Sequence, residues 1–161
     1  VRKKMDEVGN RGELVISVNG FVPKPFTPYQ WEPLCNVKTL KHRFKILSDG
    51  LKKDKRIKLI TESLRETILQ AVLARGDRKL GDFLLEAHEN NASLKSILKI
   101  HGIDIETLAE KELISGQILP WSHIDIGVKE NYLAQELIRS KEGKFTPMCF
   151  EGCSRCGVCN E

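Results

Sequence analysis

The chain has 161 residues, enough for one domain with a core, and its 40% apolar and 30% charged residues are typical of a globular protein. The net charge of +4 comes from Lys and Arg scattered among Asp and Glu, which favours a solvated surface over a nucleic-acid groove, so we expect no DNA partner. No apolar run approaches a membrane span, and none follows the basic residues after Val1, so we expect no membrane partner and no secretory signal. A cytoplasmic location is the default expectation.

The first part of the chain alternates between helix and strand patterns. Residues 1–12 are expected to be the end of a helix followed by a turn, and residues 13–20 form a short, β-branched, almost continuously apolar run. Such a run predicts a strand buried on both faces of a parallel sheet. Four prolines within residues 21–33 forbid helix and central strand, so an extended loop is expected there. An amphipathic helix over 37–54 and a short strand over 57–61 follow.

The second part is predicted to be helical. Its expected helices cover 64–75, 78–90, 92–101, 104–114 and 129–140. The segment from Arg75 to Arg78 is interpreted as a helix–helix junction with paired charges, and residues 119–125 as a loop. From Gly143 onward the sequence predicts a tail.

Four of the five cysteines gather in the tail, in the pattern Cys149-x3-Cys153-x2-Cys156-x2-Cys159. Disulfide frameworks spread their cysteines through a fold whereas metal sites cluster them, so the pattern indicates a metal site in a reducing compartment. The tight spacing resembles iron–sulfur ligation, and zinc is the alternative, although zinc sites usually separate two Cys pairs by a longer loop. A loose tail that binds nothing remains open. Cys35 is expected to be a buried structural thiol, with a remote ligand as the second possibility.

Two loops carry further polar groups. The proline-rich loop is either a rigid connection held by its aromatic side chains or one wall of a pocket, with Lys24, Gln30 and Glu32 as its polar groups. His123 and Asp125 lie two residues apart in the segment 119–125. A structural hydrogen bond is the preferred interpretation for this histidine, and a metal site or proton relay is the alternative.

Three segments, taken together and in order, resemble the B12-binding-domain radical S-adenosylmethionine (SAM) proteins. They are Phe21-Val22-Pro23-Lys24-Pro25-x-Thr27-Pro28-Tyr29-Gln30-Trp31, then Leu73-Ala74-Arg75-Gly76-Asp77-Arg78, and then Leu119-Pro120-Trp121-Ser122-His123-Ile124-Asp125 with the terminal cysteines. The resemblance covers roughly residues 10–160. It implies an α-rich α/β fold made of the late strands of a partial (β/α) radical SAM barrel, a helical C-terminal extension and a Cys-rich tail.

The resemblance also implies a division of the chain and a set of cofactors. Residues 1–61 would end the barrel, 62–142 would form the helical extension, and 143–161 would bind metal. The intact enzyme would use an iron–sulfur cluster to cleave SAM reductively to a 5′-deoxyadenosyl radical, with cobalamin as a further cofactor. Its substrate, a small molecule or RNA, is not supplied by the resemblance.

Within this chain, the resemblance places four residues near the cofactor or substrate at the barrel rim. These residues are Asn19, Phe21, Pro23 and Lys24. Cys149, Cys153, Cys156 and Cys159 would hold an auxiliary iron–sulfur centre or a structural zinc. Cys149-x3-Cys153-x2-Cys156 has the spacing of the catalytic radical SAM cluster, but no barrel follows it, so we expect the catalytic cluster elsewhere and this chain alone to be inactive. The missing N-terminal part of the same protein is therefore the expected partner. The alternative is a non-enzymatic metal-binding helical module that docks a protein or RNA.

Overall fold

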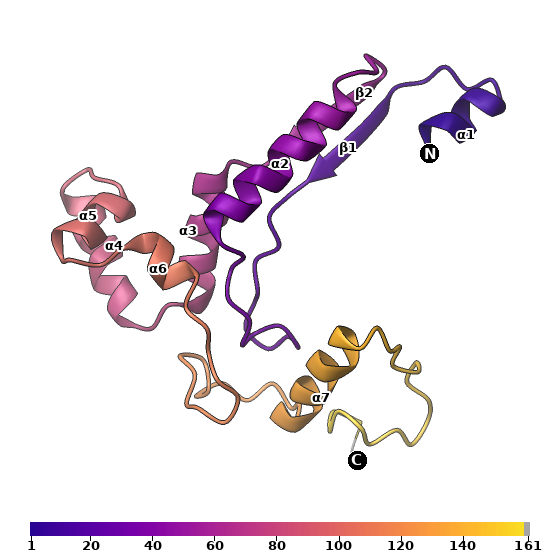
Figure 1. The fold of residues 1–161 in the computed structure, drawn as a ribbon. Coiled ribbons are helices and arrows are strands. Elements are labelled where there is room, and N and C mark those ends of the chain that lie inside the picture. Colours follow the sequence, from indigo (N-terminus) through magenta and orange to yellow (C-terminus); the bar gives the residue numbers. More distant parts are fainter. Residues whose placement is uncertain (160–161) are drawn as a thin grey trace.

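The structure is a computed structural model that describes residues 1–159, so the last two residues of the predicted tail lie outside the described part. Figure 1 shows an elongated molecule in which the strands and the long helix over residues 37–51 run together toward the N-terminus, the helices between residues 64 and 109 cluster beyond them, and the last helix stands apart with the tail. The elements are α1 (Arg2–Glu7), β1 (Leu14–Val18), α2 (Val37–Leu51), β2 (Ile57–Thr61), α3 (Leu64–Arg75), α4 (Lys79–Glu89), α5 (Leu94–Ile100), α6 (Ile105–Ala109) and α7 (Glu130–Lys141).

The two strands form a parallel pair, which confirms the predicted parallel sheet. Their register runs from Leu14 opposite Ile57 to Val18 opposite Thr61, and α2 provides the crossover between them. The prediction that the first strand is buried on both faces is wrong, because its residues alternate between half-buried and exposed and Val15 is 51% exposed. No element in residues 1–159 covers that face of the sheet, so its β-branched side chains remain in solvent.

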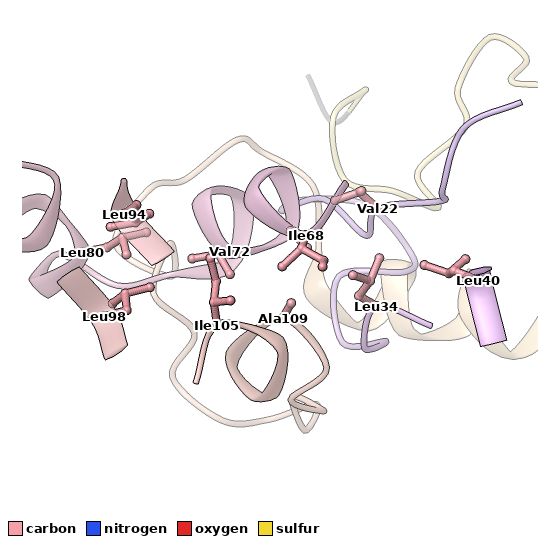
Figure 2. Close-up of a cluster of buried hydrophobic side chains, with 11 residues drawn as sticks. Val22, Leu34, Leu40, Ile68, Val72, Leu80, Leu94, Leu98, Ile105 and Ala109 are labelled. Atoms are coloured by element: carbon pink, nitrogen blue, oxygen red, sulfur yellow. The ribbon is translucent and has the colours of Figure 1, made fainter. Parts of the chain in front are cut away.

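The first hydrophobic core surrounds α3, whose residues Thr67, Ala71 and Val72 are fully buried. Figure 2 shows Leu80, Leu94 and Leu98 at one end of this core and Val22, Leu34 and Leu40 at the other, with Ile68, Val72, Ile105 and Ala109 between them. The helix begins where predicted because Ser63 and Glu66 form a capping box, in which each side chain accepts from the other residue's backbone N–H.

A second core joins the proline-rich loop to the segment before α7 and to α7 itself. Its buried members are Trp31, Leu119, Trp121 and Leu133. Gln30, only 3% exposed, ties this core together, because its Oε1 accepts from Trp121 Nε1 at 2.8 Å and from the Phe26 N–H at 3.1 Å. The interpretation of the loop as held by its aromatic side chains is therefore confirmed for Trp31. It is wrong for Phe21, which is 63% exposed.

The helix predicted over 104–114 ends already at Ala109. The residues that follow it are hydrogen-bonded to other parts of the chain instead of continuing the helix. The Leu113 N–H donates to the Trp31 carbonyl at 3.0 Å, and Arg75 donates to the Lys111 carbonyl at 2.6 Å. These bonds connect residues 111–113 to the proline-rich loop and to the end of α3 instead of extending α6. Arg75 also donates to the Glu32 carbonyl.

The described chain exposes much more surface than a compact domain of its mass. A compact monomer of 18.3 kDa has an accessible surface of roughly 8,100 Å², whereas this chain exposes 11586 Å². Part of the excess lies on α2, where the predicted apolar stripe is buried at Leu40 but 38% exposed at Leu47. None of the described helices is both long and apolar enough to cross a bilayer.

Candidate metal centre and loop cavity

The cysteine-bearing loop is attached to the beginning of α7. The backbone N–H of Lys129 donates to the Cys156 carbonyl at 2.8 Å. Two glycines of the loop, Gly152 and Gly157, adopt φ values of 79° and 94°, which favour residues without a Cβ and allow the tight turns between successive cysteines. A Cβ on Gly157 would also lie 2.9 Å from the Lys129 side chain, so the loop and the helix start are closely packed.

The four cysteine thiols of the tail are all free, and they influence one another. Cys153 is buried, Cys156 is half-buried, and Cys149 and Cys159 are exposed. The pKa of Cys159 is raised by partial loss of solvation and by the neighbouring thiols of Cys156, Cys149 and Cys153. The pKa of Cys153 is lowered, first because Arg155 donates a hydrogen bond to its sulfur. The contact with Arg155 thus biases one thiol of the loop toward the thiolate, the form that binds metals.

Four cysteine thiols are suitable ligands for a thiolate-binding metal or an iron–sulfur cluster. In this structure, however, the four thiols do not converge on one point. Within residues 1–159, no three His, Cys, Asp or Glu side chains are placed to hold one metal ion. The thiols of Cys149 and Cys159 lie at exposed positions of a glycine-containing loop. Ligation by Cys149, Cys153, Cys156 and Cys159 therefore remains a prediction that requires this loop to close.

Three of the four residues predicted for the cofactor or substrate come together at the end of β1. Asn19, Phe21 and Pro23 line a cavity of about 560 Å³ between the proline-rich loop and α2. Lys24 does not line it and instead donates to Gln70 Oε1 at 3.4 Å on the surface. A cavity outside the carboxyl end of a parallel strand is the usual position of a ligand site in open α/β sheets.

The cavity combines aromatic walls with groups of both charges. Phe21 and Tyr29 meet edge to face, with ring centroids 5.2 Å apart. Arg43 and Glu32 also line the cavity. Cys35, expected to be buried, is half-buried here with its sulfur 3.9 Å from Arg43 Nη1. It lines this cavity rather than joining the tail, which leaves its predicted role as a remote ligand without geometric support.

Two sequence interpretations need correction at the loops. No ion pair of the described residues involves Arg75, Asp77 or Arg78, so the junction between α3 and α4 exists but its charges are not paired with one another. His123 is exposed and makes no hydrogen bond to any described residue, and Asp125 accepts from the Gly127 N–H at 2.7 Å in a local turn. Neither the predicted structural bond of His123 nor a proton relay is therefore present.

The sequence interpretation gave Gln30 and Arg75 other roles, as a polar group of a pocket wall and as a charge of a helix junction, and it missed Arg155. Gln30 and Arg75 hold the loops from buried positions, and Arg155 contacts the cysteine sulfur. Two of these residues have a recognisable position in the sequence: Arg75 ends an apolar helix, and Arg155 lies between two cysteines. Arg75 donates to backbone carbonyls 43 and 36 positions away in the sequence, which no local pattern identifies. Arg155 contacts the sulfur of Cys153, which lies two positions before it.

Comparison with known proteins identifies an uncharacterized relative over about half of the chain. The chain is 37% identical over 84 residues to an uncharacterized protein, MJ0966, of Methanocaldococcus jannaschii. The aligned region covers 52% of this chain but only 18% of that relative, so the chain matches less than a fifth of its length. No protein-family model matches the chain, and no solved structure matches it.

Proposed function

We propose that this chain is the C-terminal part of a radical SAM iron–sulfur enzyme and that it contributes a four-cysteine metal site and the rim of a ligand cavity. One observation carries the proposal. Four free thiols within the eleven residues 149–159 lie on one glycine-containing loop that is attached to the start of α7. Clustered free thiols of this kind are the donors that iron–sulfur clusters and zinc use, and the cytoplasm would keep them reduced.

The parallel strands support the proposal that a further part of the same protein completes the fold. All-parallel sheets are normally covered on both faces, and an isolated two-stranded sheet is only marginally stable in water. Here Val15 on β1 and Ile60 on β2 are about half exposed on the uncovered face. The much greater length of the relative is consistent with a larger polypeptide that pairs with these strands and covers them.

The residues of this chain would have distinct tasks. Cys149, Cys153, Cys156 and Cys159 would hold the auxiliary cluster, which supplies electron-transfer or structural chemistry when bound. The cavity at Asn19 would bind SAM or a small-molecule or RNA substrate through its aromatic walls and its charged groups, and would exclude water from it. Cobalamin would belong to the remainder of the protein, because the proposal assigns no residue of this chain to it.

A second function is favoured by the exposed apolar residues around the cysteines. Phe145 is 96% exposed and Met148 is 91% exposed. Met148 immediately precedes the first cysteine of the tail, and Phe145 lies four residues before that cysteine. A zinc-bound tail that presents such side chains would suit a non-enzymatic module that docks a protein or RNA partner.

The experiment that separates the two functions uses the full-length protein that carries this chain. After anaerobic reconstitution with iron and sulfide, incubation with SAM and dithionite should release 5′-deoxyadenosine, whereas the 161-residue chain alone should release none. Replacing Asn19 and Phe21 with alanine should reduce this release without removing iron. A full-length protein that carries only zinc and leaves SAM intact would contradict the enzymatic proposal and favour the docking module.

A further inference from the structure

Arg155 directs all of its polar contacts into the cysteine loop. Its Nε lies 3.2 Å from Cys153 Sγ. Its Nη2 donates to the carbonyls of Pro147 at 2.8 Å and Met148 at 3.0 Å. Its guanidinium carbon also lies 5.9 Å from the centre of the Phe150 ring.

The positive charge of Arg155 has no carboxylate partner in the described part of the chain. Arg139 on α7 offers a contrast, because it pairs with Glu136 at 3.8 Å. The polar contacts of the Arg155 guanidinium are therefore with sulfur and carbonyl oxygen. A planar fork can bond several acceptors at once, which the single ammonium of lysine cannot do in the same geometry.

The contacts of Arg155 join two ligand positions that are separated in sequence. Met148 is the residue immediately before Cys149, so holding its carbonyl restricts where Cys149 can lie. The same side chain fixes the sulfur of Cys153. One arginine thus sets the relative position of the first two cysteines of the motif.

We propose that Arg155 is a positioning residue of the cysteine site, which holds Cys149 and Cys153 in place and stabilises the negative charge of the metal-bound thiolates. This inference rests on the metal site proposed above. Residues that donate to metal ligands commonly change metal affinity by about 10- to 100-fold when they are replaced. Hydrogen bonds to the sulfurs and local charge also set the reduction potential of an iron–sulfur cluster.

The test compares three variants of the 161-residue chain: Arg155→Gln, Arg155→Lys and, as a matched control, Arg139→Gln. Zinc affinity is measured by competition with a chromophoric chelator, and the midpoint potential is measured after reconstitution with iron and sulfide. Arg155→Gln should weaken zinc binding by about tenfold or more. It should also lower the potential, because reduction adds negative charge that the arginine stabilises. A tenfold change in the relative affinity for the two redox states corresponds to about 59 mV for one electron.

The other two variants separate charge from geometry. Arg155→Lys should change the midpoint potential less than Arg155→Gln does, because the positive charge remains. Its zinc affinity should stay below that of the parent chain, because lysine cannot hold both carbonyls and the sulfur. Arg139→Gln should leave both quantities unchanged, although it removes the same charge from a neighbouring element. The melting temperature should not change with Arg155→Gln, because Arg155 belongs to neither hydrophobic core.

Each outcome is decisive. If the parent chain binds metal and Arg155→Gln matches it in affinity and potential, the inference is overturned while the metal site stands. If Arg155→Lys binds zinc as tightly as the parent, the forked contact is not what positions the cysteines. If the parent chain binds neither zinc nor an iron–sulfur cluster, the proposed function fails and this inference fails with it.

Discussion

Replacing Trp31 with alanine is expected to release α7 and the tail from the rest of the molecule. Trp31 is 4% exposed and lies at the centre of the second core. A tryptophan side chain buries roughly 150–250 Å², which at about 25 cal/mol per Å² corresponds to an upper limit of about 4–6 kcal/mol. The Trp31 Nε1 has no hydrogen-bond partner among the described residues, and an unsatisfied buried donor costs about 1–3 kcal/mol. The net loss on this basis is about 1–5 kcal/mol. The usual cost of a Trp→Ala change, about 3–5 kcal/mol, lies in the upper part of that range and is the expected value here.

Amide hydrogen exchange is the appropriate assay, because the two cores do not share a buried residue. A loss of at least about 3 kcal/mol corresponds to a fall in protection of about 100-fold or more, unless the second core is itself less stable than that. This fall should appear in α7, while the amides of α3 and α4 keep their protection. Val72→Ala, in the fully buried centre of the first core, is the matched control and should give the reverse pattern.

Equal losses of protection in α3 and α7 after Trp31→Ala would refute the reasoning, because they would show that the two cores unfold as one unit. Unchanged exchange in α7 would refute it in another way, since α7 would then be held by contacts outside the second core. Trp31→Phe should be much milder than Trp31→Ala, because it keeps most of the apolar area and removes the unpaired N–H.

Three further changes test the packing. Arg75→Lys should lower the free energy of unfolding by about 1–3 kcal/mol in urea titrations, because a single ammonium cannot bond both carbonyls that the guanidinium now holds. Gly20→Ala should lower the free energy of unfolding by about 1–3 kcal/mol in the same assay, since the new Cβ would lie 2.5 Å from a methyl of buried Thr67. Gly50→Ala should instead stabilise α2 by about 1 kcal/mol, because a Cβ at Gly50 would meet open space. Asp104 caps α6, and the hydrogen bonds that it accepts from Thr107 lower the pKa of its carboxyl, so its contribution to stability should be complete above about pH 5 and be lost as the pH falls below about 4 toward the lowered pKa; Asp104→Asn should remove this dependence from melting curves recorded between about pH 6 and 3.

Local patterns predicted the elements whose boundaries depend on local chemistry. The bounds of α3 and β2 agree with the sequence, because α3 begins with a capping box and β2 is a short β-branched run. Gln30, by contrast, lies in a segment that was correctly expected to be an ordered loop. Its burial depends on Trp121, which is 91 positions away in the sequence. No pattern within the loop could reveal that partner.

The remaining differences arise from contacts that have no local signature or that this chain does not contain. The early end of α6 at Ala109 reflects long-range hydrogen bonds to residues 111–113, not a helix stop signal. The first strand has the composition of a fully buried strand, yet Val15 is exposed because no described element covers it. At the candidate site, the metal site predicted from the spacing of the cysteines stays a prediction, and that spacing did not indicate that Arg155 contacts Cys153.

Metal and sulfide analysis of the chain shows directly whether the cysteine tail binds an iron–sulfur cluster or zinc. The parent chain and a Cys153→Ser/Cys156→Ser variant should be purified without oxygen, reconstituted with iron and sulfide, and analysed for iron, acid-labile sulfide and zinc. The parent chain should be coloured and carry iron and sulfide, and the variant should have lost both. A parent chain that retains no metal, or a double variant that binds as much metal as the parent, would contradict the assignment of the cysteine tail as a metal site.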